Sequence, residues 1–381
     1  MIYLDNNATT PIDPQVVDTM LPFLREHFAN PSAAYRSARG VDRAITTARA
    51  QVAALIHAEP EEIIFTSGGT ESNNTAIDSA MSRWPERKHL IIGATEHPAI
   101  IEPANRWQER GGTVTRLRVN RLGQVDLDDL RTTLREHPTA LVSVMWANNE
   151  TGVIAPIAEI AAIVHEAGAL FHTDAVQAVG KLPIDVRACG IDFLSLSGHK
   201  FHAPKGIGAL FASRRVGFRP WLLGGGQEHG RRSGTENVAG IVALGAAAEL
   251  ALKADHAAVR ALRDEFESLV RDASMNGDPV QRLGTTSSLC FPGMDAAGML
   301  ILLDERGVCC SAGSACHSAA VHPSPVLEAM GFDAAHAAST LRFSFSRFNT
   351  LDEAREAARL VNECTAKMRS LAGEGMVAMA E

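Results

Sequence analysis

Residues 195–208 read SLSGHKFHAPKGIG and place a lysine, Lys200, between two histidines directly after an apolar run. Lysine is scarce in this chain, which has six lysines against thirty arginines. The preceding segment, Asp192–Ser197, has the length and composition of a strand buried on both faces. A lysine at the end of such a strand is therefore a candidate for chemistry as well as for surface charge.

Similar short apolar runs lie on both sides of this one. They predict further strands over Glu62–Thr66, His89–Gly93, Ala140–Met145, Ala169–Thr173 and Gly208–Ala212. Helical periodicity lies between them, over Ser72–Arg83, Ala99–Arg110, Leu127–His137 and Ile157–Ala167. Alternating strands and helices are typical of an α/β fold, so we predict a mainly parallel sheet flanked by helices.

The sequence pattern changes near residue 257. A long helical pattern over His256–Ala273 begins a mixed α+β segment that continues to the end of the chain. We therefore predict a large domain over residues 15–257 and a small domain formed by residues 1–14 and 258–381. Within the small domain, the apolar run Met299–Leu303 resembles a strand, and we interpret Cys309 and Cys310 after it as packing residues.

Composition excludes several classes of protein. The 381 residues are 46% hydrophobic and 21% charged, as in globular proteins, and the net charge of −8 without a basic tract does not favour nucleic acid binding. The first ten residues lack the apolar segment of a signal peptide, and the six cysteines form no CxxC pair, so we expect a reducing cytoplasm. The fourteen histidines show no zinc-binding spacing, so we expect no metal site.

Polar clusters follow five of the predicted strands. They are Ser67–Thr70, Glu96–Pro98, Asn148–Glu150, Asp174–Gln177 and Ser197–Lys200. In open α/β sheets, ligands bind outside the carboxyl ends of the strands. Each cluster alone has an ordinary explanation, such as a solvated lysine, an aspartate that caps a helix or a common glycine turn. Their recurrence at successive strand ends favours a shared site.

These residue types suit pyridoxal 5'-phosphate (PLP). A lysine such as Lys200 can bind the aldehyde of PLP as a Schiff base, and a carboxylate such as Asp174 can keep the pyridine nitrogen protonated. The phosphate requires backbone N–H groups at a helix N-terminus, which residues 68–70 can supply, with Ser197 and His199 as further donors. The glycine-rich segment 224–230 lacks the GxGxxG spacing of a dinucleotide loop.

The motifs taken together resemble a known family. In chain order they are YLDNNATT, FTSGGTESNN, TEHPAI, MWANNETG, HTDAVQAVGK, SGHKFHAPKGIGAL, GGGQEHGRRSGTEN, GSAC and LRFSFSR. They resemble the NifS/IscS class of cysteine desulfurases, and the NifS branch in particular, which are PLP enzymes among the class-V aminotransferases. The resemblance runs from residue 2 to about residue 370 and implies the aspartate-aminotransferase-like fold, fold type I.

The resemblance also implies roles for individual residues. Lys200 would be the Schiff-base lysine and proton carrier. His97 would be catalytic as well, stacking on the pyridine ring and assisting acid–base chemistry, and Gln177 would hydrogen-bond the ring hydroxyl. Asn149 and Arg342 would bind the carboxylate of the substrate. The implied cofactor-binding set is Gly69, Thr70, His97, Asp174, Gln177, Ser197, His199, Lys200 and, from the other subunit of a homodimer, Thr235.

Cys316 in GSAC would be the catalytic nucleophile. It would take the sulfur of L-cysteine as a persulfide, release L-alanine and pass the sulfur to an acceptor such as an iron–sulfur scaffold protein. The segment Ser311–Ser324 is small and polar, which is typical of a mobile loop. Here the family's SSGSACTS and LEPS read SAGSACHS and VHPS, so His317 and His322 are unusual. A protonated His317 would lower the pKa of Cys316, or the histidine simply tolerates exposure.

Three other interpretations remain open at the level of sequence. One is a selenocysteine lyase, and a second is another fold-type-I PLP enzyme such as an aminotransferase, which has no need of a loop cysteine. The third is a non-catalytic interaction subunit that has kept the fold. The third interpretation predicts loss of Lys200, Asp174 or Cys316, and all three residues are present.

Overall fold

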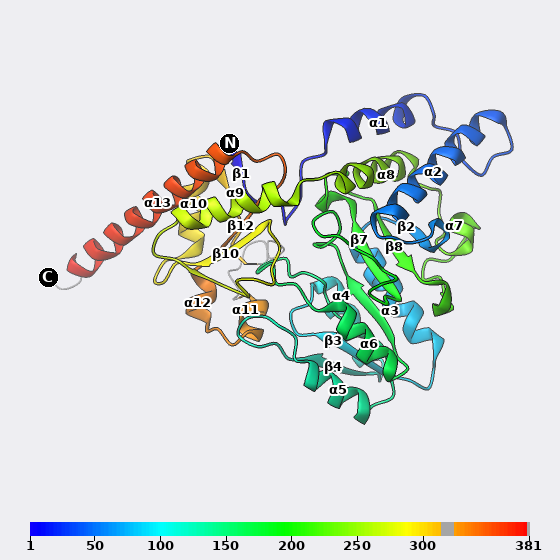
Figure 1. The fold of residues 1–381 in the computed structure, drawn as a ribbon, viewed down its shortest axis with the longest axis horizontal. Helices are drawn as coiled ribbons and strands as arrows, with labels where there is room; N and C mark the ends of the chain where they lie inside the picture. The colour runs from blue at the N-terminus through cyan, green and yellow to red at the C-terminus, as the bar shows by residue number, and fades with distance from the viewer. Residues whose placement is uncertain (314–323, 379–381) are drawn as a thin grey trace.

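A seven-stranded sheet forms the centre of the larger part of this computed structural model, which describes residues 1–313 and 324–378 (Figure 1). The strand order is β2-β8-β7-β6-β5-β3-β4, and only β8 runs antiparallel to its neighbours. This confirms the predicted mainly parallel sheet. The strands are β2 (Ile63–Thr66), β3 (His89–Gly93), β4 (Thr113–Leu117), β5 (Thr139–Ser143), β6 (Leu170–Asp174), β7 (Phe193–Ser197) and β8 (Gly208–Ala212).

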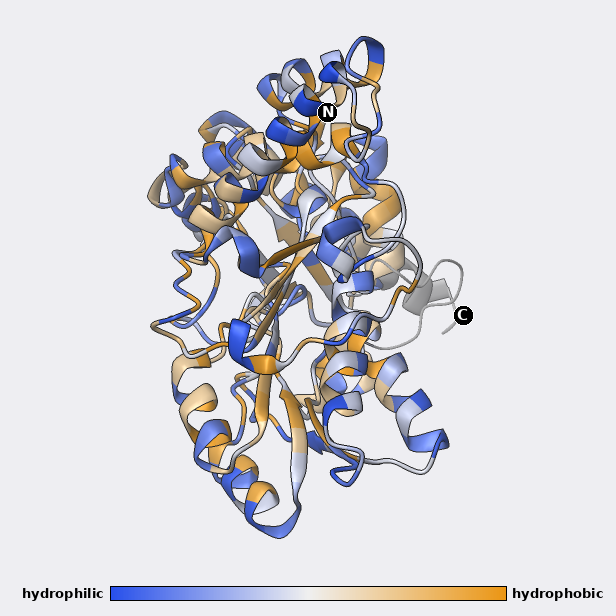
Figure 2. Ribbon diagram, turned by 90° about the vertical axis from the view of Figure 1, so that its right-hand side faces the viewer, coloured by the Kyte–Doolittle hydropathy of each residue, from blue (hydrophilic) through white to orange (hydrophobic). Residues whose placement is uncertain are grey.

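Helices cover both faces of this sheet because its strands are apolar on both sides. In β5, Leu141 packs into one core cluster and the next residue, Val142, packs into the other. Figure 2 shows apolar colouring along the central strands. One face is covered by α3 (Gly69–Arg83) and α4 (Pro98–Glu109). The other is covered by α2 (Arg36–Leu55), α5 (Leu127–Glu136), α6 (Ile157–Glu166) and α8 (Val238–Leu252).

The second part of the molecule is built from both ends of the chain. Its antiparallel sheet has the order β12-β10-β9, and β1 (Ile2–Tyr3) pairs in parallel with β11 (Val308–Cys309). The remaining elements here are β9 (Ser274–Met275), β10 (Thr286–Cys290), β12 (Thr340–Ser344), α9 (His256–Leu269), α10 (Ala296–Glu305), α11 (Pro325–Ala329), α12 (Ala334–Ala338) and α13 (Leu351–Ala378). A separate apolar core here joins Leu4 to Phe266 and Phe343. This separation supports the predicted domain division, which stays a prediction.

One sequence-based expectation is wrong. Met299–Leu303 is not a strand but the middle of α10, whose N-terminus is capped by the Asp295 side chain. Met299 and Leu303, one helical turn apart, are fully buried, whereas Ile301 is 63% exposed. The run is apolar throughout, so its helical periodicity is hidden. Cys309 lies in β11 and is partly buried, and Cys310 packs against the second core.

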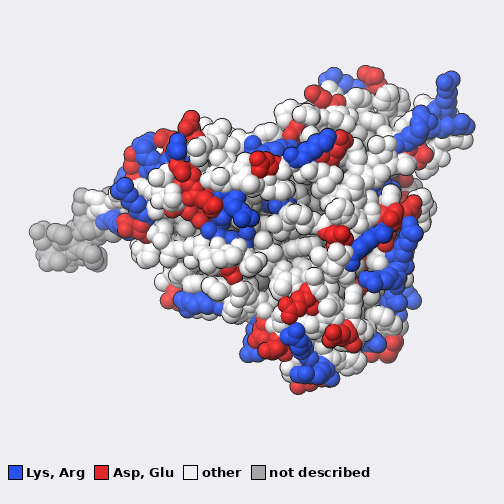
Figure 3. Space-filling view, viewed as in Figure 1, with Lys and Arg blue, Asp and Glu red and all other residues white. Residues whose placement is uncertain are grey.

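Several elements have no counterpart among the predicted ones. They include α1 (Pro14–Arg25), the four-residue α7 (Gln227–Gly230) and the edge strand β4, which is largely exposed. Within the described residues, no helix is long and apolar enough to cross a membrane. On the face shown in Figure 3, acidic and basic side chains are interspersed.

Candidate active site

The carboxyl ends of β2, β3, β5, β6 and β7 meet at one edge of the large sheet, because these strands all run in the same direction. A cavity of about 560 Å³ lies at this edge, and residues from the N-terminal segment and from β12 also line it. It brings together most of the predicted site residues, which are Gly69, Thr70, His97, Asn149, Asp174, Gln177, Ser197, His199, Lys200 and Arg342.

Lys200 ends a short 3-10 turn (Gly198–Lys200) that directly follows β7. Its Nζ donates hydrogen bonds to the main-chain oxygens of Asn7, at 2.6 Å, and Ala8, at 2.8 Å. The N-terminal segment therefore forms one wall of the lysine's site. Sequence reasoning did not assign this wall, although the motif YLDNNATT contains it.

Asp174 ends β6 and is only 3% exposed. Its Oδ2 accepts a hydrogen bond from Nδ2 of Asn73, at 2.7 Å, and its Oδ1 accepts one from the main-chain N–H of Val176, at 3.0 Å. These two bonds fix the plane of the carboxyl group. Asn73 was not among the predicted site residues, although it lies one helical turn beyond Gly69 on α3.

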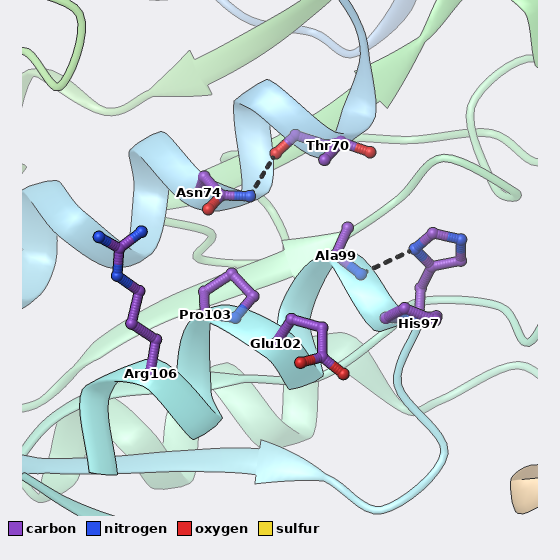
Figure 4. A pocket seen from close by; sticks show the side chains of 8 residues that line it. Thr70, Asn74, His97, Ala99, Glu102, Pro103 and Arg106 are labelled. Carbon is purple, nitrogen blue, oxygen red and sulfur yellow. Dashed lines mark hydrogen bonds between the residues drawn. The ribbon is translucent and has the colours of Figure 1, made fainter. Parts of the chain in front are cut away.

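His97 caps the N-terminus of α4 with its own side chain (Figure 4). The N–H of Ala99 donates to Nδ1 of His97 at 3.0 Å, so the proton of the neutral ring is on Nε2. Burial lowers the pKa of His97, the nearby Asp174 opposes this effect, and Lys200 adds to it. The ring is therefore a neutral group with a fixed orientation in the lining of the cavity.

The turn between β2 and α3 is shaped to admit an anion. A Cβ atom on Gly69 would lie 2.6 Å from Cγ2 of Val176, so a side chain there would require Val176 to shift. Gly68 has φ of +152°, and Ser197 Oγ is 3.6 Å from where its Cβ would be. The first amides of α3 have no carbonyl partner within the helix. Thr70, in this first turn, is exposed and lines both the cavity and the shallower hollow drawn in Figure 4.

His199 lies beside the lysine on the same turn. Its Nδ1 is 3.1 Å from Oγ1 of Thr9, so the N-terminal segment contacts this residue as well. Burial, reinforced by the cations Lys200, Lys205 and Lys181, lowers the pKa of His199 to about 4. His199 is therefore neutral at physiological pH and can act as a hydrogen-bond donor or acceptor.

Arg342, on β12, is 2% exposed and reaches the cavity from the second part of the molecule. Its Nη2 pairs with Oδ1 of Asp5 at 2.7 Å, and its Nη1 donates to the main-chain oxygen of Asn149 at 2.9 Å. Its Nε is buried and has no hydrogen-bond partner among the described residues. A buried guanidinium with an unused donor suits a carboxylate ligand.

Glu96 lines the cavity, although its sequence cluster gave it no role. Its Oε1 accepts a hydrogen bond from the main-chain N–H of Met145 at 2.6 Å, which connects the ends of β3 and β5. Its Oε2 is buried and has no partner among the described residues. Burial, assisted by the charge of Asp174, raises the pKa of Glu96 well above its ordinary value.

Thr235 does not line this cavity, and three further predicted residues lie outside the part of the chain that the structure describes. Thr235 is exposed and is not among the residues that line the cavity of its own chain. Cys316, His317 and His322 lie outside the described residues, as does most of the segment predicted to be a mobile loop. The described chain resumes at Ser324, whose Oγ donates to Oε2 of the cavity residue Glu150 at 2.5 Å.

The arrangement fits PLP. Lys200 offers an amine and Asp174 a fixed buried carboxylate. The turn at Gly68–Thr70 combines two glycines, one of them close against Val176, with the start of a fifteen-residue helix. Amine, carboxylate and anion cradle are what the aldehyde, pyridine nitrogen and phosphate of this cofactor each require.

Comparisons with known proteins give a consistent result. The family model described as Aminotransferase class-V matches residues 2–356. A cysteine desulfurase of Trichormus azollae and the cysteine desulfurase NifS of Azotobacter vinelandii are each 46% identical over 378 residues, covering 97% of this chain and 94% of theirs. A solved structure of a NifS-like protein is 34% identical with a TM-score of 0.89, covering 96% of this chain and 99% of its own. This likeness confirms the predicted fold type I.

Proposed function

This chain belongs to the class-V aminotransferase family, and we propose that it removes sulfur from L-cysteine as a PLP-dependent cysteine desulfurase. One observation carries the proposal: Lys200, Asp174 and Arg342, which lie far apart in the sequence, converge on a single cavity. The likeness to relatives that are named cysteine desulfurases along nearly the whole chain supports this function over an aminotransferase.

PLP would be held by the residues that fit it. Lys200 would hold its aldehyde, Asp174 its pyridine nitrogen, and residues 69–70 with Ser197 and His199 its phosphate. When bound, the cofactor supplies an electron sink that stabilises negative charge at the α-carbon of an amino acid. His97, neutral and fixed by Ala99, would lie against the ring. Lys200 would carry the proton that leaves the α-carbon.

Arg342 would bind the carboxylate of L-cysteine, with Asn149 beside it. Asp5 and the main-chain oxygen of Asn149 fix the orientation of the guanidinium before the substrate arrives. The substrate then meets an oriented donor, so little conformational entropy is lost when the hydrogen bonds form. Arg342 would thereby set the position of the substrate's sulfur for attack by Cys316.

Cys316 would attack that sulfur as a thiolate. A new S–S bond forms as the bond between Cβ and sulfur breaks, and the electron pair of the broken bond remains on the three-carbon fragment. That fragment takes up protons and leaves as L-alanine, and the sulfur stays on Cys316 as a persulfide. An acceptor, such as an iron–sulfur scaffold protein, would then take the persulfide sulfur.

The working unit would be a homodimer in the cytoplasm. Thr235 is exposed and does not line the cavity of its own chain, which supports a role at the cavity of a second copy. The segment that carries Thr235 is held in shape by Arg232, which pairs with Glu71 at 2.8 Å at the start of α3. This shape is therefore set before a second copy binds.

The proposal is tested by the absorbance of bound PLP and by alanine production in wild type and Lys200→Ala. We expect wild type to purify yellow and to form alanine from L-cysteine. Lys200→Ala should lose at least about 10²-fold in rate because no other group takes the α-proton. Lys253→Ala, at the exposed residue that follows α8, serves as the control. A wild type that binds PLP without forming alanine would contradict the proposal.

A further inference from the structure

Lys181 lies just behind the cavity. It is not among the cavity's lining residues, but it lines a small adjoining space of about 40 Å³ together with Lys200. Its Nζ donates to Oε1 of Gln177 at 2.6 Å and to Oδ1 of Asn7 at 3.0 Å. Both partners are acceptors, so the amine donates twice, which a charged or a neutral lysine can do.

The amide of Gln177 is hydrogen-bonded at both ends. Its Oε1 accepts from Lys181, and its Nε2 donates to the main-chain oxygen of Asn7 at 2.9 Å. If the amide flipped, its oxygen would face the oxygen of Asn7 and its NH₂ would face the amine of Lys181. The oxygen–oxygen contact is repulsive whatever the charge of Lys181, and the contact with Lys181 is repulsive when the lysine is protonated, so the two neighbours favour one orientation of the amide.

The fixed orientation determines what Gln177 offers to the cavity that it lines. Nε2 carries two protons, and the hydrogen bonds among the described residues use one of them. The remaining N–H is a donor, whereas the carbonyl end faces away toward Lys181. A donor at this position matches an anionic ring oxygen of the cofactor, which a carbonyl oxygen would repel.

The position of Lys181 is unfavourable for a lysine. Burial, together with the charges of Lys200 and Arg342, lowers the pKa of Lys181 well below its usual value. No carboxylate pairs with its Nζ among the described residues, and its two partners are amide oxygens. Chain stability alone does not call for a lysine there, since an apolar residue would avoid the desolvation cost.

We propose that Lys181 is a positioning residue for the cofactor: with the main-chain oxygen of Asn7, it locks the Gln177 amide so that an N–H faces the ring oxygen. This inference rests on the proposed function, because it assumes bound PLP. Lys181 acts only through Gln177 and does not touch the cofactor. Asn7 holds both Gln177 and Lys200 through one carbonyl oxygen, so the same segment positions two cofactor contacts.

The test is a double-mutant cycle read from the pH dependence of the absorbance of bound PLP. An N–H that faces the ring oxygen stabilises the negative charge on that oxygen. Without this N–H, the proton on the neighbouring Schiff-base nitrogen is harder to remove. Lys181→Met should raise the pH midpoint of the absorbance change by about one unit. In a Gln177→Met background, Lys181→Met should leave this pH midpoint unchanged. Lys253→Met is the matched control.

Two results would overturn the inference: an unchanged midpoint in Lys181→Met, or an equal shift in the Gln177→Met background. The second result would mean that Lys181 acts by its charge alone. If Lys181→Met does not fold, as judged by circular dichroism, Lys181→Ala, which leaves room for water, replaces it in the cycle. A wild type that binds no PLP would overturn the proposed function as well, whereas a normal wild type with an unaffected variant overturns only this inference.

Discussion

Asn7 shows how a single residue can connect both parts of the molecule at the site. Its main-chain oxygen accepts from Lys200 and Gln177, and its side-chain amide donates to the oxygens of Asn149 and Thr286. Asn7 is 1% exposed, and its bonds to Gln177 and Thr286 are buried. The main-chain part of this role needs no particular side chain, which is why sequence reasoning did not find it.

Glu96 gives a test at the scale of one residue. Its folded-state pKa is raised, so the folded protein holds a proton that the unfolded chain releases above about pH 4.5. Stability is therefore lost as the pH rises from about 4.5 toward the folded pKa. We predict that Glu96→Gln is more stable than wild type by at least about 1 kcal/mol at pH 8, with a smaller difference at pH 5.

Urea unfolding at the two pH values measures this difference. Glu102→Gln, on the exposed side of α4, is the control because its carboxyl group is in solvent in both states. The same stability difference at pH 5 and pH 8 would show that Glu96 is charged in the folded protein. Oε1 of Glu96 accepts from Met145, and a glutamine oxygen can replace it without loss of that bond.

At the scale of elements, the open edge of β2 is protected by side chains. Oε2 of Glu228 accepts from the main-chain N–H of Phe65 at 3.0 Å, and Nη1 of Arg49 donates to the oxygen of Ile63 at 2.8 Å. Arg49 and Glu228 pair through two bonds of 2.6 and 2.7 Å, and both residues are buried. Glu228 has φ of 48°, a strained conformation for a residue with a side chain.

We predict that Glu228→Gln destabilises the protein by about 3–5 kcal/mol, because it leaves the buried cation of Arg49 without a counterion. Chemical denaturation gives the free energy of unfolding. The control is Glu249→Gln, whose partner Lys253 is in solvent, and its unfolding midpoint should not change. If both variants unfold at the wild-type midpoint, the ion pair of Arg49 and Glu228 does not stabilise the edge of β2.

The sequence predicted those strands that are short apolar runs between turn residues. The strands at His89–Gly93 and Gly208–Ala212 have the predicted limits, because each is an apolar run bounded by turn residues. The strand predicted over Met299–Leu303 was wrong, because a short apolar helix and a short apolar strand have the same composition. β10, with the sequence TSSLC, was not predicted because its polar residues are buried by pairing with β9 and β12.

The site residues at strand ends were predictable from the sequence, whereas the residues that support them were not. Lys200 and Asp174 follow apolar strands, and chain order places them at one edge of the sheet. Lys181 and Asp5 act through neighbours that are distant in the sequence, so no local pattern identifies them. The pairing of Arg342 with Asp5 depends on how the two ends of the chain meet in the second part of the molecule.

For the whole molecule, exposed apolar side chains support the proposed homodimer. Phe28 is 83% exposed and Leu223 is 76% exposed, and Leu223 lies in the segment that leads to Thr235. We predict that sedimentation gives twice the chain mass of 40.7 kDa. Leu223→Asp should shift the protein toward monomers and weaken PLP retention, because Thr235 would no longer reach a second cavity.

Leu252→Asp is the matched control for this prediction. Leu252 is also exposed, at 52%, but it ends α8, away from the segment that carries Thr235. The Leu252→Asp variant should sediment as wild type does. A wild type that sediments as a monomer while it retains PLP and activity would exclude the homodimer.

The central claim is that Cys316 carries the sulfur. The most direct measurement is anaerobic turnover of L-cysteine with dithiothreitol, with alanine and sulfide quantified for wild type and Cys316→Ala. We predict equal amounts of the two products from wild type, and loss of both in the variant while its bound PLP absorbs as before. Undiminished turnover in Cys316→Ala would contradict the claim, because sulfur would then leave the substrate without passing through this residue.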